Sequence, residues 1–508
     1  MLETWLLRLP FFVILMGLAA LSMLVPALYG FATGEVDLAI VFVNCAGLLG
    51  FFTALIALAS NSRQPRNQSR NHLLTLLAAF VFLPAVMAVP FYQALPATTF
   101  LNAYVEMSSA FTTTGATLFD DPARLPNILH LWRGQVGWMG GFFVLVTAIA
   151  VLAPLNLGGF DVIASADIQQ SRAVRAADYR MGNAGRRLLR TAARCLPIYA
   201  GLTALLWLLL MVQSDAPLVN LVHAMSTLST SGISAANDGF AGQGAGWGGE
   251  LVVALPLLLA LTRHPFQPPS SMSLRQRLFE DAELRLGLIV VISVPLILFF
   301  RHWVGALEVD EQDNLRAGLL AFWGSLFTTL SFLTTTGFES GAWQQARDWS
   351  GLEHPGLVLM GLALLGGGVA TTAGGVKLLR AFALYAHGIR EMDRLVHPTS
   401  VGGAGRSSRQ LRREGAYLAW VFAMLFILSL AVTVLGFAIT GEELEQAMAL
   451  AVAALSTTGP VAQIALAEPV SFADLSNGAK AVLCAAMVLG RLETLVIIAL
   501  FNPEFWRK

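Results

Sequence analysis

Ten apolar segments constrain what this chain can fold into more than any other feature of its sequence. They begin near Leu9, Leu38, Leu73, Trp132, Leu196, Trp247, Leu286, Gly356, Ala416 and Ala479. A hydrocarbon core about 30 Å thick needs roughly 20 apolar residues per helix. The run from Trp247 is short, and five glycines interrupt the run from Gly356. With 56% hydrophobic and only 13% charged residues, the sequence predicts an all-α membrane protein with ten crossings.

The charged residues sort by side of the predicted membrane. The chain has 32 Lys and Arg against 32 Asp and Glu, so it lacks the basic surplus typical of nucleic-acid binding. Arg-rich loops at 61–72, 156–194, 263–285 and 387–414 alternate with acidic loops. Because basic loops stay in the cytoplasm, we predict a multi-pass protein with both termini cytoplasmic. The three cysteines follow no metal or redox spacing, and we interpret them as buried apolar residues.

A short polar phrase occurs four times, each time between two predicted spans and on the acidic side. The phrases are Phe111-Thr-Thr-Thr-Gly115, Leu228-Ser-Thr-Ser-Gly232, Leu333-Thr-Thr-Thr-Gly337 and Leu455-Ser-Thr-Thr-Gly459. Each phrase ends a segment that is too short or too polar to cross the membrane alone. This pattern predicts a re-entrant half-helix followed by an extended strand. Such backbone is tolerated at membrane depth only where protein buries it or where it lines a watery cavity.

Four such units around one axis would bring four Gly-ended strands together. Rings of backbone carbonyls can replace the hydration shell of a monovalent cation, and glycine allows successive carbonyls to turn to the same side. The C-terminal ends of four half-helices would add partial negative charge that favours a cation. A single phrase of this kind is also a common helix kink bridged by hydroxyls. Four phrases at near-regular spacing favour a pore over four kinks.

The repeat divides the chain into an N-terminal helix pair and four pore repeats. We place the pair at 1–71 and the repeats at 72–160, 161–283, 284–390 and 391–508. The second repeat includes the cytoplasmic loop before it, and the third includes a Gly-rich gate loop. The predicted fold is therefore ten transmembrane helices plus four re-entrant pore helices, arranged as helix, pore loop and helix around one pore.

These residues resemble the Trk/Ktr/HKT superfamily of potassium transporters, and the resemblance covers nearly the whole chain. It rests on the four phrases, on W-x-G-G at Trp138–Gly141, on the Gly-rich stretch Ala370–Arg380, and on G-R-L-E-T-L at Gly490–Leu495 followed by F-N-P-E-F-W-R. The two spans before the first repeat resemble those of a TrkH-type membrane subunit. The resemblance implies potassium uptake across the bacterial inner membrane, with K⁺ as the transported ion and no cofactor in this chain.

By this resemblance, the K⁺ ligands are each filter glycine and the two residues before it, mainly through backbone oxygens. They are Thr113, Thr114, Gly115, Thr230, Ser231, Gly232, Thr335, Thr336, Gly337, Thr457, Thr458 and Gly459. Plant relatives with Ser at the first filter position tend to favour sodium, so Gly115 implies a preference for potassium. The fourth phrase keeps a T-T-G that many Trk-type relatives have lost, which could alter the symmetry of the outer site.

The stretch Leu364–Arg380 interrupts an apolar span and is the predicted gate. A broken helix in a membrane must line a cavity or act as a hinge, and in the family the matching loop obstructs the pore below the filter. The gate residues are Ala370, Thr371, Thr372, Ala373, Gly374, Gly375, Lys377, Arg380, Arg491 and Glu493. Close helix packing by small residues, and mutual neutralisation of Arg491 and Glu493 with their neighbours, are the plain alternatives.

Two other classes of function fit the sequence less well. A secondary transporter for another solute, built on broken helices, would predict two inverted repeats, whereas this chain has four parallel ones. A membrane-embedded enzyme would need a catalytic or metal-ligand cluster, and the sequence has no such pattern. The resemblance further implies a homodimer and a separate TrkA-type cytoplasmic nucleotide-binding ring subunit. Channel-like flux and symport coupled to H⁺ or Na⁺ both remain open on the sequence.

Overall fold

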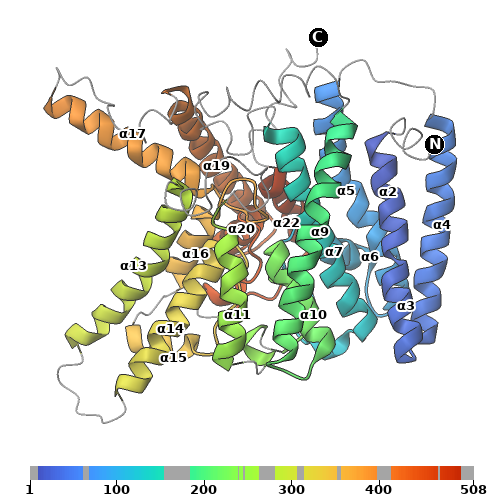
Figure 1. Cartoon of the computed structure of the whole chain (residues 1–508), viewed down its shortest axis with the longest axis horizontal. Helices are drawn as coiled ribbons and strands as arrows, with labels where there is room; N and C mark the ends of the chain where they lie inside the picture. The colour runs from blue at the N-terminus through green and yellow to red at the C-terminus, as the bar shows by residue number, and fades with distance from the viewer. Residues whose placement is uncertain are drawn as a thin grey trace.

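A computed structural model describes residues 10–60, 68–153, 184–237, 239–243, 246–262, 281–305, 314–351, 356–397, 413–466 and 469–492. These residues form a bundle of helices, most of which run along one common direction (Figure 1). No strand occurs among them. Glu493 and most of the Arg-rich loop residues lie outside the described residues.

Seven stretches of the described helices are long and apolar enough to cross a membrane. They lie on α2 (Phe11–Ser22) with α3 (Leu24–Thr33), α4 (Val36–Ser60), α5 (Gln68–Ala94), α7 (Asn127–Thr147) with the π-helical turn η2 (Ala148–Leu152), α9 (Ala184–Met211), α13 (Ala282–Gly305) and α19 (Arg413–Ile439). The other three predicted crossings fall on shorter helices, α11 (Gly246–Leu259), α16 (Gly356–Leu365) and α22 (Asn477–Leu492). The all-helical, multi-pass prediction is confirmed, while the count of ten stays a prediction.

Four further helices end directly at the four polar phrases. They are α6 (Phe100–Phe111), α10 (Pro217–Ser229), α14 (Asn314–Leu333) and α20 (Leu444–Leu455). Each packs between the helix before it and a helix after it: α6 with α5 and α7, α10 with α9 and α11, α14 with α13 and α16, and α20 with α19 and α22. The same three-helix arrangement therefore occurs four times in the described chain.

Glycines let the neighbouring helices approach the ends of three of these short helices. A Cβ on Gly140 of α7 would collide with the carbonyl of Phe111, where α6 ends, and one on Gly141 would collide with Ser229, where α10 ends. A Cβ on Gly490 of α22 would meet the carbonyl of Leu455 in the same way. The W-x-G-G and G-R-L-E phrases thus have glycine at these positions because the end of another helix packs where a side chain would lie.

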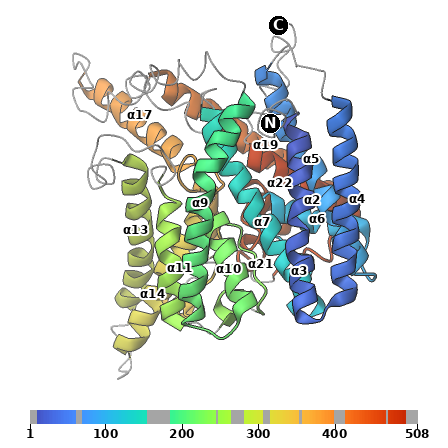
Figure 2. The ribbon, with the colours of Figure 1, turned by 45° about the vertical axis from the view of Figure 1, so that its right-hand side comes forward.

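The N-terminal helices α2, α3 and α4 stand together at one edge of the bundle and pack on α5 and α7 (Figures 1 and 2). The remaining elements are η1 (Pro122–Arg124), η5 (Ala241–Gln243), α15 (Trp343–Ser350), α17 (Leu378–Val396) and α21 (Val461–Ile464). Helix α17 projects from the bundle at the end opposite the α3–α4 turn (Figure 1). Large apolar side chains such as Leu48, Leu208 and Val432 are exposed on α4, α9 and α19, as expected for surfaces that face lipid.

Candidate ion pathway

The four polar phrases share one unusual backbone conformation. The residue two before each glycine has a positive φ: 53° at Thr113, 48° at Thr230, 58° at Thr335 and 54° at Thr457. A β-branched residue with positive φ is a genuine outlier, and such strain persists only where the surrounding structure enforces it. Four outliers at matched positions indicate that the phrases share one local backbone structure up to their glycines.

The same main-chain hydrogen bond returns each phrase onto its own short helix. The residue before the glycine donates its N–H to the carbonyl five residues earlier: Thr114 to Ser109 at 2.8 Å, Ser231 to Ser226 at 3.0 Å, Thr336 to Ser331 at 2.9 Å and Thr458 to Ala453 at 2.8 Å. In three phrases the side chain of that same residue also bonds the hydroxyl two residues earlier. These pairs are Thr112–Thr114 at 2.9 Å, Ser229–Ser231 at 3.0 Å and Thr334–Thr336 at 3.2 Å.

The glycines of the four phrases meet in a closed ring. A Cβ on Gly115 would collide with the carbonyl of Ser231, and one on Gly232 with the carbonyl of Thr336. One on Gly337 would press on the ring of Pro460. The ring closes where Gly459 donates its N–H to the carbonyl of Thr114 at 2.6 Å. The contacts therefore run from the first phrase through the second and third to the fourth, and back to the first.

The fourth phrase departs from the other three after its glycine. Gly115, Gly232 and Gly337 have φ of 74°, 67° and 80°, whereas Gly459 is not in this left-handed region. Pro460 follows Gly459 and caps the short helix α21 (Val461–Ile464). Because a proline has a fixed φ and starts helices readily, the chain turns away there instead of continuing as a strand. The retained T-T-G thus does not make the fourth phrase equivalent to the others.

On the other side of the ring, the four strained threonines present their hydroxyls to the predicted gate loop and to Arg491. Thr230 donates to the hydroxyl of Thr372 at 3.1 Å, and Thr335 accepts the N–H of Gly374 at 2.7 Å. A Cβ on Gly374 would collide with the hydroxyl oxygen of Thr457. The loop therefore lies directly against three of the four phrases, on the side to which their strained threonines point.

Arg491 links the gate loop to the first and fourth phrases. Its guanidinium donates to the carbonyls of Thr112 at 2.7 Å and Thr372 at 2.6 Å, and to the hydroxyl of Thr457 at 2.9 Å. It also donates to the hydroxyl of Thr113. The side chain is buried, so these bonds are shielded from water and correspondingly strong. The structure brings Arg491 together with the loop, as the resemblance implied.

The gate loop is the irregular segment between α16 and α17. Its two ends pair like a short hairpin, with the N–H of Val376 on the carbonyl of Leu364 at 2.9 Å and that of Leu378 on Gly367 at 3.0 Å. Ala370 and Lys377 have positive φ values of 56° and 83°. Thr371 donates to the carbonyl of Gly368 at 2.7 Å. The loop is thus a defined, strained structure and not a frayed helix end.

Two basic residues that follow the loop, Lys377 and Arg380, are both buried. Lys377 donates its ammonium to the carbonyl of Ala373. Arg380 is fully buried, and its guanidinium carbon lies 3.6 Å from the centre of the Phe422 ring. Val369, Ala370 and Ala383 belong to a small apolar cluster with Ala148 of η2. The structure therefore places every described gate residue from Ala370 to Arg380 in one region below the glycine ring.

In three repeats, the side chain nine residues before the glycine bonds the segment that follows the phrase. Glu106 accepts the N–H of Leu118 at 3.0 Å and forms a 2.6 Å ion pair with Arg133, both side chains being buried. His223 Nε2 lies 2.8 Å from the hydroxyl of Ser234, and Thr328 accepts the N–H of Ser340 at 3.3 Å. The fourth repeat has Leu450 there.

The sequence predicts that Glu106, inside the first half-helix, braces that phrase, but it does not single out Arg133 or a second buried carboxylate, Glu250 on α11. Both missed residues are lone charges inside apolar helices, and charges in spans are costly and usually functional. Glu250 accepts bonds from Trp323, Ser340 and Gly341, so it acts on the third repeat.

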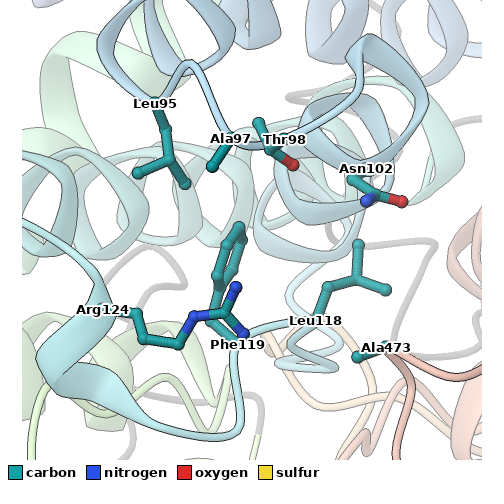
Figure 3. Close-up of a pocket in the computed structure, with 8 residues that line it drawn as sticks. All are labelled: Leu95, Ala97, Thr98, Asn102, Leu118, Phe119, Arg124 and Ala473. Atoms are coloured by element: carbon teal, nitrogen blue, oxygen red, sulfur yellow. The ribbon is translucent and has the colours of Figure 1, made fainter.

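A cavity of about 320 Å³ lies beside the first repeat (Figure 3). Its lining includes Leu118, Phe119, Arg124 and, from the fourth repeat, Ala473. The guanidinium carbon of Arg124 is 5.9 Å from the centre of the Phe119 ring. None of the filter or gate residues that the structure describes lines this cavity, so it belongs to the surroundings of the ring and not to the ring itself.

Comparison with known proteins identifies the family. The family model for TrkH, described as a cation transport protein, matches residues 42–242 and 278–508. The chain is 28% identical over 504 residues to a Trk system potassium uptake protein TrkH of Vibrio parahaemolyticus, covering 97% of this chain and 98% of the relative. It is 29% identical to that of Escherichia coli strain K12, covering 92% and 94%. A solved structure of the Vibrio parahaemolyticus potassium transporter TrkH has a TM-score of 0.77 at 24% identity over 100% of both chains, which shows the same fold. The chain therefore belongs to the TrkH family of cation transport proteins.

Proposed function

We propose that this chain mediates potassium uptake across the bacterial inner membrane, through a filter formed by the four phrases and a gate formed by the loop near Ala370–Gly375, within the stretch Leu364–Arg380. The named relatives are potassium uptake proteins, which supports K⁺ as the ion. The observation that carries the proposal is the closed ring of four phrases with one shared backbone conformation. Its candidate ligands are the backbone oxygens of Thr113 to Gly115 and of the equivalent residues.

Ion passage requires the ring to open from the arrangement described. The carbonyl of Thr114 accepts the N–H of Gly459 at 2.6 Å, so this oxygen points at the fourth phrase and one of its two lone pairs is occupied. Movement of the fourth phrase away from the first would release it. Arg491 contacts both of these phrases, and the gate loop contacts the fourth phrase and Arg491 itself, so gate movement and ring opening are mechanically coupled.

The same proposal extends to topology and assembly. The basic loops and α17 would lie in the cytoplasm and the α3–α4 turn, with Glu35 and Asp37, outside. Ten crossings and four re-entrant helices would satisfy this orientation. A TrkA-type nucleotide-binding ring would act on the cytoplasmic face, and two copies of the chain would form a homodimer with one pore each.

Flux through the purified full chain in lipid vesicles tests the proposal. Potassium and sodium fluxes are measured separately, each with and without an imposed proton gradient. We expect potassium flux to exceed sodium flux clearly. The response to the proton gradient distinguishes channel-like passage from proton-coupled symport. Equal fluxes of both cations, or no potassium flux from folded protein, would refute the proposal.

A further inference from the structure

Glu250 is a buried carboxylate that serves a repeat other than its own. It lies just after the first turn of α11, the helix that follows the second phrase, and is 4% exposed. Its two oxygens accept the indole N–H of Trp323 at 2.6 Å and the main-chain N–H of Gly341 at 2.7 Å. The hydroxyl of Ser340 donates to the same carboxylate at 2.8 and 2.9 Å. All of these donors belong to the third repeat.

The residues held by Glu250 form the segment that leaves the third phrase. We call residues 338–342 the third exit segment. Its first N–H, from Phe338, bonds the hydroxyl of Ser331 at 2.7 Å, and its last residue, Ala342, packs so closely on α14 that a Cβ on Gly324 would collide with it. Only two residues separate Gly337 from Ser340, so a shift of the exit segment is transmitted to the carbonyl of Gly337.

In the first and third repeats, a buried carboxylate holds the segment that leaves the phrase, but the two carboxylates lie on different helices. In the first repeat, Glu106 on α6 holds Leu118, three residues after Gly115. The equivalent position on α14 is Thr328, whose hydroxyl reaches Ser340 only at 3.3 Å. A neutral hydroxyl is a weaker acceptor than a carboxylate. The neighbouring repeat provides the stronger acceptor from α11, and the two braced phrases face each other across the ring.

We propose that Glu250 is a positioning residue for ion selectivity: it fixes the third exit segment and thereby the carbonyls of Thr336 and Gly337. This inference rests on the proposed filter function. Selectivity depends on the placement of filter carbonyls, and a carboxylate with three donors holds backbone more rigidly than neutral side chains do. Glu250 does not touch the ion in this account.

The test replaces Glu250 without changing its shape. In Glu250→Gln, the amide NH₂ must face either Trp323 or Gly341, both obligate donors, so one bond is lost and one donor is left buried. We expect the potassium-to-sodium flux ratio in vesicles to fall about tenfold, as one lost charge-assisted bond predicts. Asp37→Asn is the matched control, because Asp37 is an exposed carboxylate on the same predicted side; its flux ratio should stay at the wild-type value.

A second variant keeps the test decisive if Glu250→Gln does not fold. Trp323→Phe removes only the indole donor and keeps an aromatic ring, and we expect a fall in the flux ratio of about threefold to fivefold from one weakened bond. Folding is checked by size-exclusion chromatography and thermal unfolding in detergent. An unchanged ratio in folded Glu250→Gln, or in Trp323→Phe where only that variant folds, would overturn the role of Glu250 while leaving the filter intact. Wild-type protein without potassium preference would instead refute the filter itself.

Discussion

At the residue scale, Gly232 tests whether the phrases select ions. A side chain at Gly232 meets two penalties, a φ of 67° and a collision with the carbonyl of Thr336. We expect Gly232→Ser to lower the potassium-to-sodium flux ratio about tenfold, since displaced carbonyls coordinate K⁺ poorly and a factor of ten needs only about 1.4 kcal/mol. The measurement is paired cation flux in vesicles.

Gly239 provides the matched control for this substitution. Its φ is 64°, but an added Cβ has no neighbour within 4 Å. Gly239→Ser therefore carries the backbone strain of about 1 kcal/mol without the collision, and its flux ratio should equal that of the wild type. A normal ratio in Gly232→Ser would remove the second phrase from the filter.

Arg491 is predicted to restrain the gate through its directed hydrogen bonds as well as its charge. Arg491→Ala loses the bonds to Thr112, Thr372 and Thr457, and we expect potassium flux to rise about tenfold. Arg491→Lys keeps the charge but cannot reproduce the guanidinium fork. If the hydrogen bonds restrain the gate, potassium flux in Arg491→Lys should rise as it does in Arg491→Ala. Wild-type flux in both variants, at equal protein levels, would exclude Arg491 from the barrier.

The residues that sequence could predict are those whose pattern repeats or whose family phrase is distinctive. The four phrases and Arg491 are of this kind, and the structure gathers them in one region. Arg133 and Glu250 act through contacts between different helices, and Glu250 and its partner Trp323 are 73 positions apart in the chain. No spacing in a single sequence encodes such a pairing, although each residue is visible as an isolated charge in an apolar helix.

At the element scale, the gate loop is held against the ring by small residues. Gly374 packs on the carbonyl of Ser456 and the hydroxyl of Thr457. We expect Gly374→Ala to push the loop away from the fourth phrase, because the added Cβ would clash sterically with both atoms. Potassium flux should then rise severalfold. Gly361→Ala in α16 is the control, as its added Cβ meets nothing within 4 Å. Flux reduced or unchanged in Gly374→Ala would contradict a loop that obstructs passage.

Helices were predictable to different degrees for physical reasons. Long apolar runs such as that of α4 are readily predicted as membrane-spanning helices, since roughly 20 apolar residues span a membrane. Helices α11, α16 and α22 are shorter than such a span, and hydropathy alone does not say where they end. The turn after Gly459 also escaped prediction, although Pro460 is a readable signal for the helix start at α21.

At the scale of the whole molecule, four unequal repeats surround the proposed ion pathway. The repeats share a three-helix arrangement, but they differ in how each exit segment is held and in the turn after the fourth glycine. The N-terminal helices pack outside this arrangement on α5 and α7. The repeat pattern predicted the architecture, whereas the asymmetry depends on contacts between repeats that only the structure reveals.

The central claim is that a cation binds between the four phrases. The most direct measurement is the anomalous scattering of rubidium in crystals of the full chain grown in rubidium chloride, since Rb⁺ replaces K⁺ and marks its own position. The account predicts Rb⁺ density on the axis of the ring, within coordination distance of backbone oxygens from Thr113–Gly115, Thr230–Gly232, Thr335–Gly337 and Thr457–Gly459. Well-ordered Rb⁺ found only elsewhere, with the ring resolved and empty, would contradict it.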